Sequence, residues 1–174
     1  MYKILLTGAR GFVGKHLHLG LQDEYIVDTF DGDITSLSDI RNIVPEYDIY
    51  IHCAAKSSVN NSDHKQMWKV NLEGTENLIK HITERQVTQF QFIFFSSATV
   101  YTPTKVPRTE IFPTVPISEY GRTKLEAEKS LRAAHADWGF RLAILRPCAI
   151  VGKYMTHGIT KDLVDKLPTD NPLL

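Results

Sequence analysis

The glycine-rich segment Thr7–Gly14 (TGARGFVG), which directly follows an apolar N-terminal run, constrains the fold of this chain more than any other feature. Between a strand and a helix, Gly8 permits a tight turn, Gly11 lets a pyrophosphate approach the backbone, and Gly14 lets the helix pack closely on a sheet. The helix N-terminus then presents unpaired N–H groups and a positive dipole end to phosphates. The segment therefore predicts a strand–turn–helix unit that binds a dinucleotide. The other loop residues that we assign to this ligand are Arg10, Phe12 and Val13.

Apolar runs alternate with amphipathic segments along the rest of the chain. Five runs have the composition of buried strands: Tyr2–Thr7, Tyr25–Phe30, Tyr47–Ala54, Phe90–Phe95 and Arg141–Leu145. Segments with helical spacing lie between and after them: Phe12–Leu21, Thr35–Val44 (with Thr35 or Ser36 as its cap), Lys65–Thr83, Glu119–Ala136 and Ile159–Leu167. Strands that are separated by helices imply right-handed crossovers between parallel neighbours. The predicted fold is therefore α/β, a Rossmann-like doubly wound parallel sheet with helices on both faces.

The composition is that of an ordinary soluble globular chain of 174 residues, with 43% hydrophobic and 23% charged residues. Twenty basic residues balance twenty acidic ones, so no bulk field favours nucleic acid or an anionic membrane as a partner. Cys53 and Cys148 lie in apolar stretches and are interpreted as reduced core thiols, and no His/Cys spacing resembles a metal site. The N-terminus starts a strand at once, and no apolar run is long enough to span a bilayer. These features predict a cytoplasmic protein.

A carboxylate at the end of the second strand is expected to hold the ribose hydroxyls of the adenosine. Asp28, Asp31 and Asp33 are all in reach, and we choose Asp31, which lies 23 residues after Gly8. An acidic residue there favours NAD because it repels a 2′-phosphate, although Arg10 in the glycine loop leaves NADP open. The other residues assigned to this part of the cofactor are Asp33 and Ile34 at the adenine edge, and the small Ala54 and Ala55 where the third strand ends.

A second pattern predicts a proton relay. Tyr120 and Lys124 stand four apart on a predicted helix, so their side chains share one face. A free tyrosine titrates near pH ~10, and a nearby ammonium group and the positive nicotinamide ring would favour its phenolate. The Ser96-Ser97 pair follows a predicted strand, at the edge where open α/β sheets bind their ligands. A serine and the tyrosine could then move a proton at one substrate oxygen as a hydride leaves the carbon.

Taken together, the motifs resemble the extended short-chain dehydrogenase/reductase superfamily, and most closely its NAD-dependent nucleotide-sugar epimerase/dehydratase branch. The glycine spacing G-x-x-G-x-x-G is itself typical of that group. The motifs that carry the resemblance occur in the right order over nearly the whole chain: Thr7–Gly14, Asp33-Ile34, His52–Ala55, Asn71 with Gly74-Thr75, Ser96–Tyr101, Tyr120–Lys124 and Leu145–Pro147.

The resemblance implies Ser97, Tyr120 and Lys124 as the catalytic set, with NAD as the cofactor. It places Asn71 near the active site and Pro147 along the nicotinamide pocket. Two further residues are assigned to the cofactor, Ser96 and Lys56, although a surface position is an equal alternative for Lys56.

Ser97–Tyr101 is similar to the 4-epimerases of this branch, whereas the dehydratases place Asp-Glu at the positions of Ala98 and Thr99. Dehydration is therefore disfavoured. The chain departs from the branch at Thr102, where glycine is usual, and at Ala149, where many sugar-nucleotide enzymes have an asparagine that contacts the substrate diphosphate.

The expected activity is NAD-dependent epimerisation of a nucleotide-linked sugar by transient hydride abstraction and return. Two alternatives stay open: an NAD(P)H-dependent reductase of a 4-keto nucleotide sugar, and a non-catalytic NAD-binding scaffold. Residues 1–150 are expected to form the NAD(P)-binding domain with the catalytic set, and residues 151–174 the start of an incomplete substrate-binding lobe. The resemblance also implies a homodimer through the two long helices, 65–83 and 119–136.

Overall fold

A computed structural model describes residues 1–57, 63–86, 88–153 and 155 of the chain. In this part the chain forms a sheet with the strand order β2-β1-β3-β4-β5, in which every neighbouring pair is parallel. The strands are β1 (Lys3–Thr7), β2 (Ile26–Phe30), β3 (Ile49–His52), β4 (Gln91–Phe95) and β5 (Arg141–Leu145). Because the order reverses between β1 and β3, a topological switch point lies at the carboxyl ends of these two strands.

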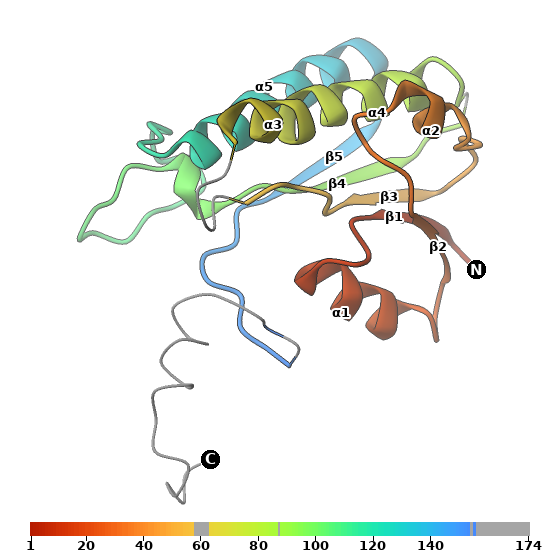
Figure 1. Cartoon of the computed structure of the whole chain (residues 1–174), viewed down its shortest axis with the longest axis horizontal. Helices are drawn as coiled ribbons and strands as arrows, with labels where there is room; N and C mark the ends of the chain where they lie inside the picture. Colours follow the sequence, from red (N-terminus) through yellow and green to blue (C-terminus); the bar gives the residue numbers. More distant parts are fainter. Residues whose placement is uncertain (58–62, 87, 154, 156–174) are drawn as a thin grey trace, which may run out of the picture.

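Helices cover both faces of the sheet, as the sequence predicts (Figure 1). Helix α1 lies on one face, and the other helices lie on the opposite face. Their bounds are α1 (Phe12–Leu21), α2 (Leu37–Arg41), α3 (His64–Trp68), α4 (Gly74–Thr83) and α5 (Glu119–Trp138). Within the described residues, no helix is long and apolar enough to cross a membrane.

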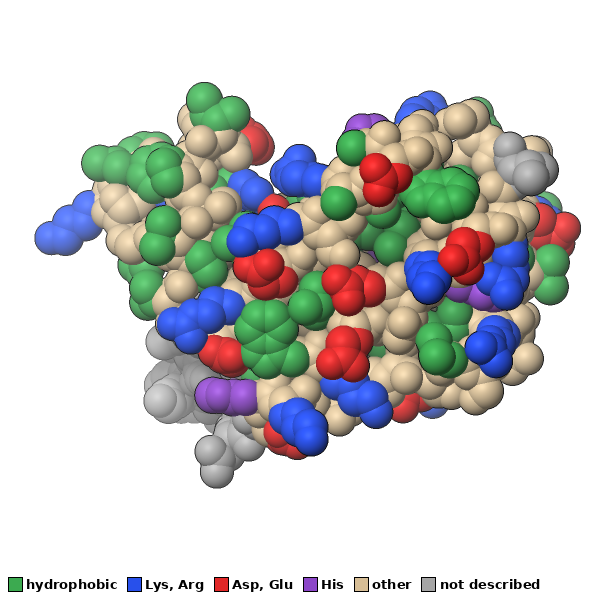
Figure 2. Space-filling model, turned by 90° about the horizontal axis from the view of Figure 1, so that it is seen from above, with side chains coloured by type: hydrophobic (Ala, Val, Ile, Leu, Met, Phe, Trp, Pro, Cys, Tyr) green, Lys and Arg blue, Asp and Glu red, His purple; other side chains and the backbone are tan. Residues whose placement is uncertain are grey.

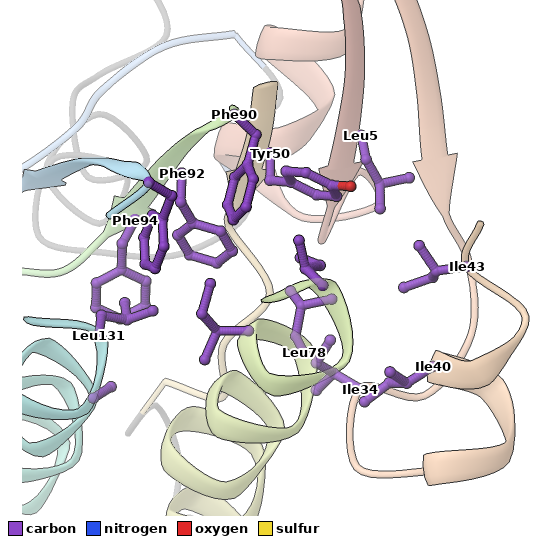
Figure 3. Packing of buried hydrophobic residues seen from close by; sticks show 14 residues of the cluster. Leu5, Ile34, Ile40, Ile43, Tyr50, Leu78, Phe90, Phe92, Phe94 and Leu131 are labelled. Carbon is purple, nitrogen blue, oxygen red and sulfur yellow. The ribbon is translucent and has the colours of Figure 1, made fainter. Parts of the chain in front are cut away.

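The alternation of side chains along the strands divides the core in two. On the face of α4 and α5, Tyr50, Phe92 and Phe94 are almost fully buried. Figure 3 shows Phe94 beside Leu131 of α5, and Leu78 of α4 beneath the sheet residues. On the face of α1, a smaller cluster forms around the buried residues Ile4, Leu6 and Ile51. Burial of these apolar side chains fixes which face of each strand points toward which helix.

The predicted helix over residues 65–83 is interrupted in the structure. It begins at His64, because the Asp63 side chain caps it by accepting from the N–H groups of Lys65 and Gln66. A five-residue π-helical segment, η1 (Lys69–Glu73), then separates α3 from α4. Such segments are frequent at functional sites, because the extra residue re-aims the side chains around it.

The other helix ends follow local capping chemistry. Of the two caps expected for α2, the structure selects Ser36, whose side chain accepts from the Asp39 N–H. Ser118 caps α5 in the same way, and α5 ends at Gly139, whose φ is +72°. The helix expected over Ile159–Leu167 lies outside the described residues.

Candidate functional site

A pocket of about 310 Å³ lies at the switch point between β1 and β3. It joins the glycine loop to the segments that follow β2 and β3. Of the residues that the sequence assigns to a cofactor, these line it: Gly8, Arg10, Gly11, Asp31, Asp33, Ile34, Ala54 and Ala55. The structure therefore brings the predicted phosphate, ribose and adenine residues together in one pocket.

The three glycines have different physical roles. Gly8 has a φ of +73°, and a Cβ added there would lie 2.6 Å from the backbone nitrogen of Ala54. A Cβ on Gly14 would lie 2.2 Å from the Gly8 carbonyl oxygen, so the fold itself requires both. A Cβ on Gly11 would meet only the Gly8 carbonyl oxygen, at 3.2 Å. Apart from this one tight contact the Gly11 position is open and lines the pocket, which fits a ligand that approaches the backbone.

The same loop offers hydrogen-bond donors to an anion. Gly11 is the N-cap of α1, and no side chain caps the helix there. The first N–H groups of α1 are thus available beside the open space at Gly11, which is the arrangement that binds phosphate groups. The pocket and its donors fit a dinucleotide.

The three candidate ribose carboxylates have different surroundings. Asp28 accepts a hydrogen bond from the Tyr47 hydroxyl at 3.1 Å and does not line the pocket. Asp33 accepts from the N–H and the hydroxyl of Thr35 through one oxygen. Asp31 lies on the pocket and pairs with Arg10 at 3.3 Å, with both side chains more than half exposed. Asp31 is therefore the carboxylate that faces the pocket with an exposed ion pair.

Ser97 stands directly after β4 and caps the short 3-10 turn η2 (Ala98–Val100). Its Oγ accepts from the Thr99 N–H at 3.2 Å and from the Thr99 hydroxyl at 2.9 Å. Because both contacts use oxygen lone pairs, the hydroxyl hydrogen of Ser97 is left to donate. The backbone N–H of Ala98 donates to the Pro147 carbonyl at 2.9 Å, which ties this turn to the segment after β5.

The first turn of α5 packs directly on this 3-10 turn. A Cβ on Gly121 would lie 2.3 Å from the Thr99 carbonyl oxygen, so only glycine permits the approach. The neighbouring Tyr120 is thereby carried to the end of β4. Lys124 is 1% exposed, and its Nζ lies 4.1 Å from the centroid of the Phe94 ring. The structure thus gathers the segments that carry Ser97, Tyr120 and Lys124 at one end of β4.

Burial is the main cause of the pKa shifts of Tyr120 and Lys124. It lowers the pKa of the Lys124 ammonium to about 7, and the nearby Cys53 and Glu128 oppose the shift only in part. Burial also raises the pKa of the Tyr120 phenol. The sequence argument expects a lysine charge to favour the phenolate. In the structure desolvation acts on both groups, so the chain by itself favours the neutral phenol.

Three residues predicted for the nicotinamide side, Asn71, Ser96 and Pro147, do not line the glycine pocket. Asn71 lies in η1 with 1% of its surface exposed. Its amide accepts from the Lys56 N–H at 2.8 Å and donates to the Lys56 carbonyl and to the Thr123 hydroxyl, each at 3.0 Å. The Ser96 hydroxyl donates to Glu128, away from the glycine pocket. Pro147 lines a separate pocket of about 610 Å³ beyond β5.

Two more buried polar groups, His52 and Glu128, lie near these residues, and only Glu128 was not anticipated from the sequence. His52 is 1% exposed, and its ring bonds to the hydroxyls of Thr7 at 2.6 Å and Thr75 at 2.9 Å. Burial lowers its pKa to about 3, so it stays neutral. Glu128 is also 1% exposed, and Arg146 pairs with it. The available signal for Glu128 was its position four residues after Lys124, on the same helix face.

The buried ammonium of Lys124 should make stability depend on pH. Its folded pKa of about 7 is below the unfolded value of about 10.4. The destabilisation is therefore complete below pH 7 and is relieved as pH rises toward 10. We expect Lys124→Met to raise Tm by at least about 5 °C at pH 6 and by less at pH 9. Thermal unfolding measures both, with the exposed Lys129→Met as control. An equal gain at the two pH values would contradict the assignment.

Known proteins are similar to this chain in sequence and in fold. Residues 4–168 match the NAD dependent epimerase/dehydratase family. The UDP-glucose 4-epimerase of Vibrio cholerae is 33% identical over 172 residues, which cover 86% of this chain and 52% of that protein. A crystal structure of UDP-galactose 4-epimerase superposes with a TM-score of 0.83 at 26% identity, over 94% of this chain and 62% of that one.

A structure of RMD from Pseudomonas aeruginosa complexed with NADPH superposes with a TM-score of 0.80 at 27% identity, over 87% of this chain and 55% of that one. The chain spans about half the length of the curated relatives that it matches. The family match covers nearly the whole sequence and agrees with the parallel sheet and its glycine loop. The chain therefore belongs to the NAD dependent epimerase/dehydratase family.

Proposed function

We propose that this chain binds NAD along the carboxyl edge of its sheet and carries the catalytic residues of a nucleotide-sugar epimerase. The observation that carries the proposal is the gathering of the segments of Ser97, Tyr120 and Lys124 at the end of β4. The glycine pocket at the neighbouring switch point supports it. The UDP-sugar 4-epimerases among the similar proteins supply the substrate class.

Each part of the cofactor has residues suited to hold it. The N–H groups at Gly11 and the start of α1 would bind the pyrophosphate, and Asp31 would bind the ribose hydroxyls. Bound NAD supplies the acceptor for a hydride from a sugar carbon. NADP stays open as the cofactor because Arg10 could pair with its 2′-phosphate. The Arg10 side chain lies beside Asp31, the proposed ribose ligand, and is more than three-quarters exposed. The residues proposed for the rest of the cofactor are Phe12, Val13, Lys56, Asn71, Ser96 and Pro147.

The chain's own residues would move one proton. Tyr120 accepts the proton of a ring hydroxyl as the C–H hydride leaves, and it returns the proton when the hydride returns to the other face of the sugar. Ser97 donates its free hydroxyl hydrogen to the same oxygen. Lys124, when protonated, stabilises the tyrosinate. Ala98 and Thr99 supply no carboxylate for the loss of water, which favours epimerisation over dehydration.

We further propose a homodimer through the helical segments 65–83 and 119–136, which contain α4 and most of α5, and a cytoplasmic location. The support for the dimer is that these helices lie side by side on an outer face, where Figure 2 shows charged and apolar side chains interspersed. Sedimentation equilibrium tests it: a species near the monomer mass of 19.8 kDa at micromolar concentration would contradict the dimer. The substrate lobe proposed for residues 151–174 lies almost wholly outside the described residues.

Cofactor binding should depend on the open space at Gly11. We expect Gly11→Ala to weaken NAD binding at least about tenfold, equivalent to about 1.4 kcal/mol, because the added methyl enters the space proposed for the pyrophosphate. Isothermal titration with NAD and NADP measures both affinities. Gly20→Ala is the matched control, since a Cβ there meets nothing within 4 Å. Equal NAD affinities in wild type and Gly11→Ala would contradict the pocket assignment.

Turnover separates the proposed reaction from its alternatives. With UDP-galactose and NAD, an epimerase forms UDP-glucose with no net absorbance change at 340 nm, whereas a 4-keto-sugar reductase can only run in reverse, which forms NADH and raises that absorbance. We expect conversion by the wild type and a loss of at least about a thousandfold in Tyr120→Phe, which cannot exchange the proton. Product is measured by chromatography. Tight NAD binding without conversion would instead favour the non-catalytic cofactor module for this chain.

A further inference from the structure

A buried carboxylate lies next to the catalytic residues, where the proposed mechanism gives it no role. Glu128 stands on α5 one helical turn after Lys124, with 1% of its surface exposed. Removing a carboxylate from water costs several kcal/mol unless an opposite charge and hydrogen bonds compensate. The partners that compensate Glu128 therefore also determine how α5 is held against its surroundings.

Arg146 and Ser96 supply this compensation. Arg146 Nε donates to Oε1 of Glu128 at 2.9 Å, and its Nη2 donates to Oε2 at 2.5 Å. The Ser96 hydroxyl donates to the same Oε1 at 2.5 Å. A second guanidinium, that of Arg132, lies 3.9 Å from Oε2. The paired contacts from Arg146 have the bidentate geometry that fixes orientation as well as distance.

Ser96 and Arg146 follow two neighbouring strands of the sheet. Ser96 follows β4, and its N–H donates to the Leu145 carbonyl of β5 at 2.8 Å. Arg146 follows β5, and its Nη1 donates to the Tyr101 hydroxyl at 2.6 Å and to the Glu110 carbonyl at 3.1 Å. One carboxylate thus joins α5 to the ends of β4 and β5 and to the loop that follows η2. Ser96 is the chain neighbour of Ser97, so this junction adjoins the proposed proton donor.

We propose that Glu128 is a positioning residue, which acts through Arg146 and Ser96 to hold the helix of Tyr120 and Lys124 in register with Ser97. The inference rests on the proposed function, because it takes these three residues as the catalytic set. The hydrogen bonds of Glu128 join both segments that carry these residues, α5 and the end of β4. A shift of α5 along β4 would break the bidentate contact before it separated the apolar side chains, since directional bonds tolerate less displacement than packing does.

The same carboxylate also acts on the charge of Lys124. The titratable groups that face Lys124 are Cys53 and His52 at the end of β3, and Tyr120 and Glu128 on its own helix. Burial keeps the first three neutral near pH 7. Cys53 favours the ammonium only as a thiolate, and burial raises the pKa of that thiol to about 12, so near pH 7 Glu128 supplies the negative charge, with Arg146 and Arg132 partly offsetting it. Without Glu128, less Lys124 would be protonated at neutral pH.

Glu128→Gln tests the inference, because it keeps the shape of the side chain and removes its charge. Arg146→Lys keeps the positive charge and removes the bidentate contact. Glu126→Gln is the matched control, since Glu126 lies on the same helix, is 41% exposed and pairs only with the nearby Lys129 among the described residues. The double variant E128Q/R146M, which removes both charges of the Glu128–Arg146 pair, replaces the single variant in the kcat measurement if that variant does not fold.

The readout is the pKa of Lys124, measured in the full chain from the NMR signal of its Cε carbon as pH is varied. That signal is assigned by its absence in Lys124→Met. We expect the Lys124 pKa to fall by about one unit in Glu128→Gln, as for the loss of a charge several ångströms away. It should not change in Glu126→Gln. In Arg146→Lys we expect kcat for UDP-galactose to fall at least about tenfold at unchanged KM.

Two results would overturn the inference: an unchanged Lys124 pKa in a folded Glu128→Gln protein, or a kcat in Arg146→Lys equal to that of the wild type. Failure of every variant to fold would likewise overturn it, by assigning the cluster to stability alone. The titration needs no turnover. If the wild type binds NAD without converting UDP-galactose, the proposed function fails, while the pKa shift still decides whether Glu128 controls Lys124.

Discussion

Two contacts between a helix and a backbone carbonyl determine where the helices stand over this sheet. A Cβ at Gly14 would collide with the carbonyl of Gly8, and a Cβ at Gly121 would collide with that of Thr99. Both contacts occur where a strand has just ended and a helix passes over the turn. The first brings the amide end of α1 to the switch point. The second brings the first turn of α5 to the end of β4. The glycine pocket and the proposed catalytic cluster both follow from these two close approaches.

The close packing that assembles the site also makes it electrostatically costly. The side chain of Lys124 extends from α5 onto the ring of Phe94, where its ammonium loses most of its hydration. A cation over an aromatic face recovers part of this loss, and a nearby carboxylate recovers more. These opposing effects leave the pKa of Lys124 at about 7, so both the ammonium and the neutral amine are populated near neutral pH. Chemistry that needs a charged lysine must therefore draw on its surroundings, including any bound ligand.

Much of this architecture follows from local sequence patterns. The apolar runs predicted all of the described strands within a few residues, and α1 matches its predicted range, because burial against a helix requires continuous apolar segments there. The π-helical segment at Lys69–Glu73 was not predictable, since one extra residue barely alters a helical pattern that is read over many residues. The pairing of Glu128 with Arg146 was also missed, because it depends on how β5 lies beside α5.

The candidate site divides in the same way. The glycine loop and the Tyr120/Lys124 spacing are short patterns whose geometry is set by one turn or one helix, so the sequence locates them directly. The spacing after Gly8 favours Asp31 among Asp28, Asp31 and Asp33, whereas their surroundings needed the structure: Asp28 lies off the pocket, and Asp33 is engaged by Thr35 of its own turn. The pKa of Tyr120 needed it too, since burial cannot be deduced from spacing.

The hydrogen bonds around His52 have a direction. The Ala54 N–H donates to the Thr7 hydroxyl, and at the other end the Thr75 hydroxyl donates to the Asn71 carbonyl. Thr75 must then accept from Nε2 of His52, and Nδ1 must accept from Thr7. Because burial keeps the ring neutral, a single tautomer, with the proton on Nε2, satisfies this one-way chain. His52 therefore connects the start of the glycine loop at Thr7 to the π-helical segment at Asn71 through hydrogen bonds of fixed direction. Neither segment can shift without breaking one of these bonds.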